Sequence, residues 1–283
     1  NDFFELPYIT SLKTKKEILE ATNKKLSELL IIKDREYKEI LSIINYTIDD
    51  TNILVNLEGI KVFKNICRLN KNSANLTKIK SLLTSCFEKF KDKKTNVKLE
   101  LFDLFNIIIT YNVFNFEIFI MFILQNSLSN KNPIVKQNLL EYLKEIFNKS
   151  NIINNNSNNI KTDESANVSL GKRYTNNDND NDNDFPQNEN NNNNDKNFSE
   201  ILNKNLIPKI ISNFARPLTD IIKDDSQSQI NQVKDIAVEI LLQIKIILFS
   251  EPDKNLIEKF NALISKLPNF RYNMINKGRA KSF

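Results

Sequence analysis

A short polar turn followed by an apolar helical stripe recurs along this chain, and that recurrence limits the folds that the chain can adopt. The clearest copy is SNKNPIVKQNLLEYLKEIF, which covers residues 129–147. Pro133 stands where a helix begins, because the first turn of a helix makes no use of the N–H that proline lacks. The apolar residues beyond it recur at spacings of three and four, which predicts an amphipathic helix; they are Val135, Leu139, Leu140, Leu143 and Phe147.

Four turns share this pattern of polar residues, including Asn, followed by Val and often by Lys. They are DTNILV, KKTNVK, NKNPIVK and SQINQVK, and their valines are Val55, Val97, Val135 and Val233. The valines are 42, 38 and 98 residues apart, and the last spacing falls to about 48 when an insertion of about 50 residues is removed. A period of about 40 to 47 residues is typical of HEAT-type helix pairs, which stack because no pair buries its own apolar face.

The composition favours the same architecture. Only 3 Gly and 7 Pro in 283 residues argue against a turn-rich sandwich or barrel, and the 40% of apolar residues, with 19 Phe, is enough to build a core. We therefore predict an all-α fold, an α-solenoid of about five to six HEAT-type helix pairs whose turns line up along one edge. The net charge of +5 is modest, so an acidic partner is expected only where lysines gather.

The apolar periodicity also places the helices along the chain. Gly59 falls inside one of them, where glycine costs about 1 kcal/mol relative to alanine. Either a close helix–helix contact or a neutral replacement accounts for it. The predicted helices cover residues 14–30, 35–47, 53–69, 76–90, 99–110, 116–128, 133–147, 233–248 and 255–267, with one or two more within residues 198–223.

The longest apolar stretch, residues 107–124, is almost long enough to cross a membrane, for which about 20 residues are needed. Asn112, Asn115 and Glu117 interrupt it. We therefore predict two buried helices that meet at residues 112–115, and we expect no membrane partner.

Catalysis is not expected. The chain has no histidine, which removes the commonest general base and most zinc sites. It also has no glycine-rich phosphate loop and no nucleophile elbow. Cys67 and Cys86 lie in apolar helical patterns and are expected to be buried reduced thiols, with a lone disulfide as the alternative. We predict neither a metal site nor a cofactor.

One segment interrupts the helical pattern. In residues 151–197, 19 of 47 residues are Asn, and few large apolar groups are present to offset the entropy of ordering. We predict a disordered insertion, with residues 1–150 and 198–268 forming one domain on either side of it, and residues 269–283 forming a basic tail or linker. Since the first residue is Asn1 and not Met, we expect a piece of a longer protein.

Three of the turns resemble those of a known family. DTNILVNLEGIK, FEKFKDKKTNVK and SNKNPIVKQNLLEYL are similar to the second, third and fourth intra-repeat turns of the TOG domain, the paddle-shaped, tubulin-binding HEAT array of microtubule polymerases. The resemblance covers the chain apart from the insertion and is closest to the second TOG domain. It implies a non-catalytic, monomeric domain that captures αβ-tubulin or a microtubule end and supports polymerisation. It also implies a cytoplasmic location on the microtubule cytoskeleton, at the spindle or at a microtubule-organising centre.

The family contacts tubulin through the turns along one edge, so the resemblance implies a set of binding residues. In the first turn the family has a Trp, and this chain, which has no Trp, has Lys15 at the matching place beside Lys16. The fifth turn has Lys234 where the family often has Arg. The second, third and fourth turns supply Asp50, Thr51, Asn52 and Val55; then Lys93, Lys94, Thr95 and Lys98; and then Lys131, Asn132 and Lys136.

The repeated lysines also suggest a partner on physical grounds alone. A lysine in the first turn of a helix is mildly unfavourable against the helix dipole, so its repetition there indicates function. A ridge of lysines attracts an acidic partner and sets its register. The alternatives are solvated turn residues without a partner, a HEAT scaffold that binds another protein through the same edge, and a nucleic-acid-binding solenoid. Few aromatic residues lie among the turn lysines for base stacking, so we expect no nucleic acid.

Overall fold

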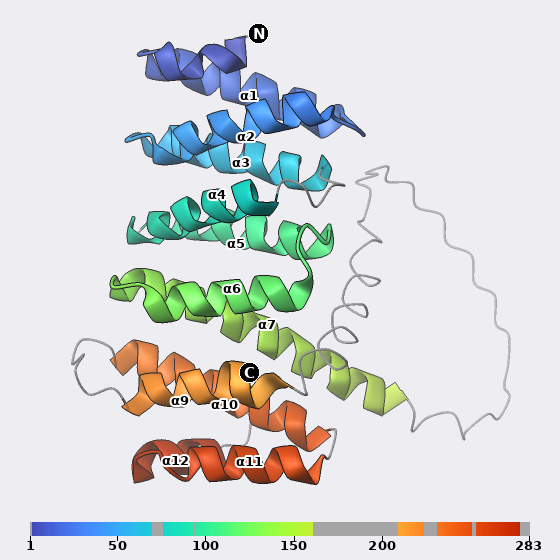
Figure 1. Cartoon of the computed structure of the whole chain (residues 1–283), viewed down its shortest axis with the longest axis vertical. Coiled ribbons are helices and arrows are strands. Elements are labelled where there is room, and N and C mark those ends of the chain that lie inside the picture. The colour runs from blue at the N-terminus through green and yellow to red at the C-terminus, as the bar shows by residue number, and fades with distance from the viewer. Residues whose placement is uncertain are drawn as a thin grey trace, which may run out of the picture.

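In the computed structural model, which describes residues 2–69, 76–92, 94–160, 209–223, 231–250 and 253–277, helices stack along the whole length of the molecule. Figure 1 shows them lying across the long axis, with the chain running back and forth between two edges. Every regular element within the described ranges is helical. The predicted all-α fold is confirmed.

The helices are listed here in chain order. They are η1 (Asp2–Tyr8), α1 (Leu12–Glu28), α2 (Asp34–Asp49), α3 (Ile53–Leu69), α4 (Leu76–Glu88), η3 (Lys89–Lys91), α5 (Thr95–Thr110), α6 (Phe116–Ser129), α7 (Pro133–Ile160), η6 (Ile211–Ala215), α9 (Arg216–Lys223), α10 (Asn231–Ser250), α11 (Lys254–Ile264) and α12 (Asn269–Lys277). η1 and η3 are 3-10 helices, and η6 is a π-helical turn that leads directly into α9.

Consecutive helices run antiparallel in pairs, and the pairs stack in two layers (Figure 1). One layer contains α1, α3, α5, α7, α10 and α12, and the other contains η1, α2, α4, α6, η6 with α9, and α11. The closest contacts join partners of a pair, such as α2 with α3 and α6 with α7, and neighbours within a layer, such as α1 with α3, α3 with α5, and α7 with α10. Six pairs lie within the described residues, which confirms an α-solenoid of the predicted size.

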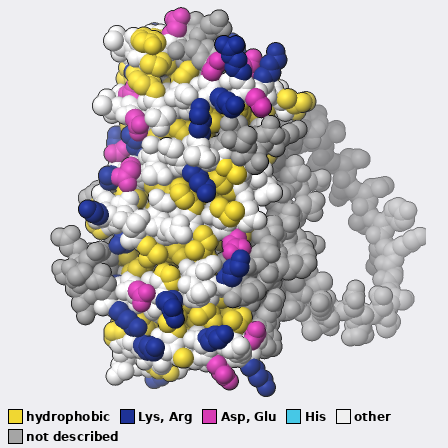
Figure 2. Space-filling model, in the orientation of Figure 1, with side chains coloured by type: hydrophobic (Ala, Val, Ile, Leu, Met, Phe, Trp, Pro, Cys, Tyr) yellow, Lys and Arg dark blue, Asp and Glu magenta, His cyan; other side chains and the backbone are white. Residues whose placement is uncertain are grey.

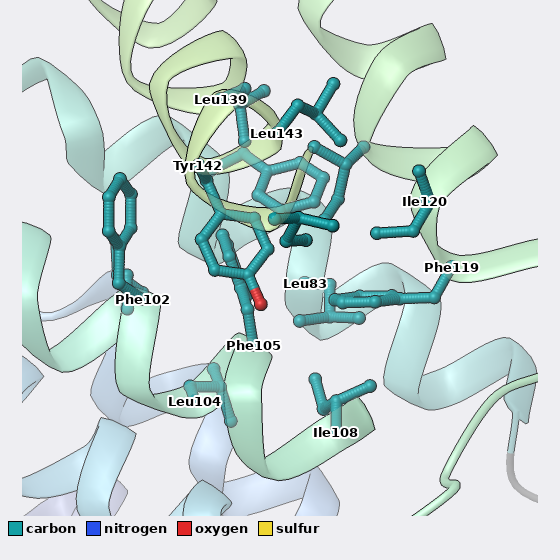
Figure 3. Close-up of a cluster of buried hydrophobic side chains, with 14 of the residues drawn as sticks. Leu83, Phe102, Leu104, Phe105, Ile108, Phe119, Ile120, Leu139, Tyr142 and Leu143 are labelled. Carbon is teal, nitrogen blue, oxygen red and sulfur yellow. The ribbon is translucent and has the colours of Figure 1, made fainter. Parts of the chain in front are cut away.

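An aromatic cluster from α4, α5, α6 and α7 fills the centre of the stack (Figure 3). The ring of Phe105 lies 5.0 Å from Tyr142, 5.9 Å from Phe119 and 5.5 Å from Phe87, centroid to centroid. All three contacts are edge-to-face, the arrangement that aromatic quadrupoles favour. The hydroxyl of Tyr142 donates to Asn106 Oδ1 at 3.1 Å, so its polar end is satisfied at the margin of the core.

The long apolar stretch forms two helices, as predicted. α5 ends at Thr110 and α6 begins at Phe116, and Asn112 turns the chain between them with a φ of 50°. The side chain of Asn115 caps α6 by accepting from the backbone N–H groups of Glu117 and Ile118. Among the helices that the structure describes, none is both long and apolar enough to cross a membrane.

Gly59 marks a close approach of α3 to α2. A Cβ at this position would lie 2.8 Å from Thr47 Cβ and nearer still to the hydroxyl oxygen of Thr47. Thr47 is fully buried and donates its hydroxyl to the Ile44 carbonyl at 2.8 Å, so it has little room to move. Of the two explanations for this glycine, the close helix–helix contact is therefore the correct one.

Both cysteines are buried and unpaired, as predicted. Cys67 lies on α3 and Cys86 on α4, and each is fully enclosed by apolar neighbours of the core. Burial raises the pKa of both thiols well above the ordinary value. Two inert thiols in the core follow from this placement.

Two differences from the predicted ranges are the start of α5 and the presence of α12. α5 begins at Thr95, earlier than residue 99, because Val97 is buried and draws the first turn onto the core. Asn269–Lys277, predicted as part of a basic tail or linker, form α12 instead. α12 packs against α10 and buries Ile275, so a single apolar anchor within a polar segment was enough to dock it.

Several predictions fall on residues outside the described ranges. α7 continues to Ile160, into the segment predicted as a disordered insertion, and residues 161–197 of that segment lie outside. Four further parts of the predictions also lie outside the described ranges. They are residues 198–208 of the helical region before α9, residues 224–230 of the polar turn before α10, Lys93, and residues 278–283 of the predicted tail.

Candidate functional site

The turns within the helix pairs line up along one edge of the solenoid, at the left in Figure 1. We call this the turn edge, and it consists of residues 9–11, 50–52, 89–92 with Lys94, and 130–132. The predicted binding residues of the first four turns, where the structure describes them, lie in these turns or among the first five residues of the helix that follows. Lys234 is the fourth residue of α10, and the turn before it lies outside the described ranges. The predicted alignment is therefore confirmed for the described turns, whereas their use by a partner stays a prediction.

The turn between α2 and α3 is held by its own side chains. Asp50 Oδ1 accepts from the backbone N–H of Asn52 at 2.8 Å, and Asn52 Oδ1 accepts from the N–H of Leu54 at 2.9 Å. The second of these bonds caps the N-terminus of α3. Thr51 lies between the two capping residues and is exposed. The arrangement leaves one side chain free to face a partner while its neighbours hold the backbone.

The turn between α6 and α7 repeats this geometry. Asn130 Oδ1 accepts from the N–H of Asn132 at 2.8 Å, and Asn132 Oδ1 accepts from the N–H of Ile134 at 2.9 Å. Asn130 also donates its amide to Glu88 Oε1 at 2.8 Å, which ties this turn to the preceding pair. Lys131 occupies the exposed middle position, the equivalent of Thr51.

The turn between α4 and α5 has a different structure. η3 carries Lys89 and Lys91, and Lys91 forms an ion pair with Glu88. Lys94 stands at the N-cap of α5, where its side chain makes no capping hydrogen bond, and both Lys94 and Asp92 are exposed. Because the N-cap is a lysine, this helix start presents a cation where the two neighbouring turns present a capping amide.

A buried asparagine supports the turn edge from beneath. Asn56 is 3% exposed, and its amide nitrogen lies 2.9 Å from the carbonyl oxygens of Thr47 and Ile48 and 2.8 Å from that of Asp50. These carbonyls lie at the C-terminus of α2, where the last turn of a helix lacks its usual N–H partners, although that of Thr47 also accepts from the backbone N–H of Asp50 at 3.4 Å. Asn56 thereby fastens the start of α3 to the end of α2 and makes the turn rigid.

Lys15 is committed to an internal contact. Its ammonium lies 2.7 Å from Asp50 Oδ2 and 2.9 Å from the Tyr46 hydroxyl, and its side chain is only 12% exposed. The hydrogen bond to Asp50, followed by that to Tyr46, raises the pKa of Lys15. Burial acts to raise the pKa of Asp50, but the hydrogen bonds from Lys15 and from the Asn52 backbone outweigh it and hold that pKa below its ordinary value. Lys15 therefore joins the first pair to the second.

Lys98 is held in a similar way. Its ammonium forms an ion pair with Glu141 of α7 and lies 5.3 Å from the centre of the Phe102 ring. Burial acts to raise the pKa of Glu141, but the hydrogen bonds from Lys98 and Gln137 outweigh it and lower that pKa. Lys98 thus connects α5 to α7, and its side chain remains 35% exposed.

The valines of the repeated pattern are core residues. Val55, Val97, Val135 and Val233 are at most 2% exposed. Val55 was included among the predicted binding residues, but its burial confines it to holding the turn in place. The physical reason is that the third residue of each of these helices points inward, toward the other layer.

The remaining predicted residues differ in exposure. Lys94, Thr95 and Lys131 are exposed, and Asn132, Lys136 and Lys234 are half-buried. Lys16 lies 3.2 Å from Glu20 on the same helix and keeps 44% of its side chain exposed. The cations displayed by the turn edge are therefore concentrated between α4 and α7.

Ion pairs between neighbouring helix pairs were not anticipated from the sequence. Most of them follow the layer that contains α1, α3, α5, α7, α10 and α12, and the partners in several of them lie about one repeat apart in the chain, a spacing that could have revealed them. These pairs are Lys15–Asp50, Lys64–Glu100, Lys64–Asp103, Lys98–Glu141, Lys144–Glu239 and Asp235–Arg271. In the other layer, Lys209 pairs with Glu117 of α6. On the face that Figure 2 presents, basic and acidic side chains also lie close to one another along the left of the molecule.

Apolar groups on the turn edge also went unnoticed in the sequence. Tyr8, at the end of η1, is 85% exposed, and Leu12, at the start of α1, is 39% exposed. Both flank the first turn, and neither belongs to the apolar stripe of α1 that contains Leu19 and Leu26. An apolar residue that lies off the apolar stripe of its helix is expected to be exposed, and this signal in the sequence could have identified Leu12. Within the described residues no group of three or more metal-ligating side chains is present.

No protein-family model matches the chain, and no curated protein matches it. Among solved structures, the designed armadillo repeat protein YIII(Dq)4CqI aligns with a TM-score of 0.38 and 13% sequence identity over 98% of this chain and 96% of that chain. So distant a likeness carries no argument about function. The assignment of the fold rests on the stacked helix pairs themselves.

Proposed function

We propose that the chain is a tubulin-binding domain of the TOG type, which captures αβ-tubulin or a microtubule end through the turn edge. The observation that carries the proposal is the alignment of three turns on one edge, each of which resembles the corresponding tubulin-contacting turn of that family. In two of them, the capping side chains Asp50, Asn52, Asn130 and Asn132 hold the backbone and leave one residue facing outward.

The proposed mechanism is capture by a rigid surface. Lys94, Lys131 and Lys136 face solvent or are half-buried between α4 and α7, and such a group of cations raises the rate at which an acidic partner associates. The domain itself carries out no chemistry in this proposal, and hydrolysis of GTP belongs to tubulin. It acts in the cytoplasm on the microtubule cytoskeleton, where capture supports polymerisation.

The first turn contributes differently from the family pattern. Lys15 occupies the place that matches the family's Trp, and its ammonium is bound to Asp50. Tyr8 and Leu12 are the exposed apolar groups in this turn. We expect them to supply the apolar contact there, since a buried aromatic often dominates the binding energy of an interface.

Size-exclusion chromatography with purified αβ-tubulin tests the proposal. The wild-type chain is expected to co-elute with tubulin at low salt and less completely at moderate salt, because the lysine contacts are screened. The double variant Lys94→Glu/Lys136→Glu is expected to weaken co-elution by about tenfold or more in apparent affinity.

A matched charge reversal controls for net charge. Lys24 and Lys25 are exposed on the last turns of α1, away from the turn edge, and Lys24→Glu/Lys25→Glu changes the total charge by the same amount. This variant is expected to bind tubulin like the wild type. Equal binding by the Lys94→Glu/Lys136→Glu variant contradicts the assignment of the edge, and no co-elution by the wild type at either salt concentration contradicts tubulin binding itself.

The second candidate is a helical scaffold that binds another acidic protein through the same edge. The internal contact of Lys15 favours it, because the first turn then lacks the anchor on which the family relies. Absence of tubulin co-elution, together with a folded chain, supports this candidate. Titration with single-stranded and duplex oligonucleotides tests for a nucleic-acid partner, for which we expect no binding.

A further inference from the structure

Three large apolar side chains are exposed on α10 and α12, at the C-terminal end of the stack (Figure 1). We call them the end row. They are Phe249, near the end of α10, and Phe270 and Met274 on α12, with exposed fractions of 53%, 70% and 40%. One exposed apolar residue is ordinary on a protein surface, whereas a group of neighbours indicates a contact with a partner.

The helical period sets Phe270 and Met274 side by side. They are four residues apart on α12, which places them about 40° apart around the helix and one turn apart along it. Ile275, the fully buried residue by which α12 docks, lies about 100° or more away from both. Packing of α12 therefore does not require these two apolar side chains.

Contacts of Lys245 bring Phe249 to the same row. The Lys245 ammonium lies 3.1 and 3.0 Å from the carbonyl oxygens of Ile275 and Asn276, and so caps the C-terminus of α12. The same nitrogen lies 5.7 Å from the centre of the Phe249 ring. Phe249 therefore stands just beyond the end of α12, and the end row follows this helix from its first turn to past its last.

Cations accompany the apolar groups along the row. The guanidinium carbon of Arg271 lies 5.8 Å from the centre of the Phe270 ring, and Lys245 stands over Phe249. Lys277, in the last turn of α12, is exposed and lies seven residues after Phe270, on the same side of the helix. Each end of the row thus has a positive charge beside an exposed ring.

The carboxylates of these two helices are neutralised within the protein. α10 and α12 together carry four cations and two carboxylates, and both carboxylates belong to α10. Asp235 forms an ion pair with Arg271, and Glu239 forms one with Lys144 of α7 at 2.7 Å. The surface around the end row therefore has an excess of positive charge.

We propose that the end row docks on an anionic membrane surface, with Phe249, Phe270 and Met274 entering the zone between headgroups and acyl chains. A helix that presents large apolar groups with Lys or Arg beside them is typical of segments that lie in this zone. The excess of positive charge is complementary to anionic headgroups.

The contact is with the membrane surface alone, since none of the described helices is long and apolar enough to span a bilayer. Our sequence prediction of no membrane partner rested on the lack of a spanning helix. A peripheral contact through exposed side chains needs no such helix, so the proposal replaces that prediction for the end row.

Two other occupants fit the end row less well. A second copy of the chain would bring two surfaces of the same charge together, which opposes pairing. A nucleic acid gains much of its affinity from cations that bind phosphates. Here Arg271 and Lys245 already contact Asp235 and the end of α12, so few cations are available for that purpose.

Sedimentation of the full chain with lipid vesicles tests the proposal. The vesicles are phosphatidylcholine alone and phosphatidylcholine mixed with phosphatidylserine. The wild type is expected to sediment with the mixed vesicles and to bind phosphatidylcholine alone more weakly by about tenfold or more. The end row lies outside the turn edge and the assay contains no tubulin, so failure here leaves the proposed tubulin contact untouched.

Variants of the two rings locate the contact. Phe249→Ser/Phe270→Ser is expected to weaken binding to the mixed vesicles by about tenfold or more, because two large apolar groups no longer enter the membrane. Phe249→Leu/Phe270→Leu keeps apolar groups at both positions and is expected to bind within about threefold of the wild type.

Matched substitutions elsewhere serve as controls. Leu30→Ser/Ile31→Ser, in the turn between α1 and α2, removes two apolar groups that are 85% and 74% exposed and is expected to bind like the wild type. Lys277→Glu is expected to weaken binding by about threefold or more, whereas Lys25→Glu, exposed on α1, is expected to have little effect.

Four results overturn the proposal. They are no sedimentation of the wild type with the mixed vesicles, equal binding to the two kinds of vesicle, equal binding by Phe249→Ser/Phe270→Ser and the wild type, and an equal loss in Leu30→Ser/Ile31→Ser. Binding of a glutamate-rich peptide without binding of vesicles also overturns it, in favour of a protein partner. Circular dichroism before sedimentation verifies that each variant is folded, as expected for exposed positions.

Discussion

The contact between α1 and α3 and the contact between α5 and α7 join neighbouring helices of the same layer by different means. α1 buries only Leu19 and Leu26. Its contact with α3 relies on Asn23, whose amide lies 3.3 Å from the Glu58 carbonyl and 3.2 Å from Glu58 Oε2. Asn65 in turn donates to the backbone and side-chain oxygens of Asn23 at 3.3 and 3.2 Å.

The contact between α5 and α7 consists largely of rings. Phe102 and Phe105 lie 5.1 and 5.0 Å from Tyr142, centroid to centroid, and all three side chains are buried. Burial of an aromatic side chain contributes far more than a partly exposed hydrogen bond. We therefore expect the stack to be strongest in its middle. The first pair is attached by asparagine hydrogen bonds and by the Lys15–Asp50 ion pair, and pH can weaken that ion pair.

The largest effect is expected from Phe105→Ala. The ring is fully buried and contacts aromatic side chains of three helices, so its removal leaves a cavity in the centre of the stack. We expect a loss of about 3–5 kcal/mol in the free energy of unfolding, measured by chemical denaturation. Leu99→Ala on the same helix is the control, because Leu99 is exposed and its loss is expected to cost less than about 0.5 kcal/mol.

The second-largest loss of stability is expected from Gly59→Ala. α3 takes part in the first of these contacts, and its position is set by the close approach of Gly59 to Thr47. We expect a loss of about 2–3 kcal/mol in the free energy of unfolding, because the added Cβ forces α3 away from α2. Alanine normally stabilises a helix relative to glycine by about 1 kcal/mol, so a more stable variant contradicts the close contact.

Lys15→Met is expected to have a smaller effect that is confined to the first pair. The variant leaves Asp50 without its ion pair, at a cost of about 1 kcal/mol to the attachment of α1. Hydrogen exchange is expected to show faster exchange of the α1 amides and unchanged exchange of the α5 and α7 amides. Lys16→Met is the control, since Lys16 pairs only with Glu20 on its own helix in the described structure.

The same ion pair predicts a pH dependence. The pKa of Asp50 is below its ordinary value of 3.8, so its contribution is present at neutral pH and is lost as the pH falls through the folded-state pKa. The pKa of Lys15 is above its ordinary value of 10.5, so its contribution is present up to that pH and is lost as the pH rises through the folded-state pKa. The difference between wild type and Lys15→Met should therefore shrink in acid below about pH 4; a constant difference contradicts the role of the pair.

Much of the fold could be predicted because it depends on local patterns. The apolar period located α2, α3 and α6 within two residues of their ends, and Asn112 and Asn115 located the joint between α5 and α6. The four valines predicted the repeat because each must reach the core at the same position of its helix. α12 escaped prediction because a single buried side chain, Ile275, leaves no period to detect.

The candidate site was less predictable, because exposure depends on neighbours that are distant in the chain. Lys15, Lys98 and Lys131 look alike in the sequence, each at or beside the start of a helix. The structure commits the first to Asp50 and the second to Glu141, and leaves the third exposed. A lysine of this edge stays exposed only where the next pair of helices places no carboxylate beside it.

The amino-acid sequence by itself determined that helices form, where most of them begin, and that they stack with their turns on one edge, since these follow from capping, turn chemistry and apolar period. Only the tertiary structure decided which lysines of that edge are held in ion pairs, and why Gly59 must lack a side chain. The physical reason is that pairing and close packing depend on side chains far apart in the chain, which meet only when the stack is assembled.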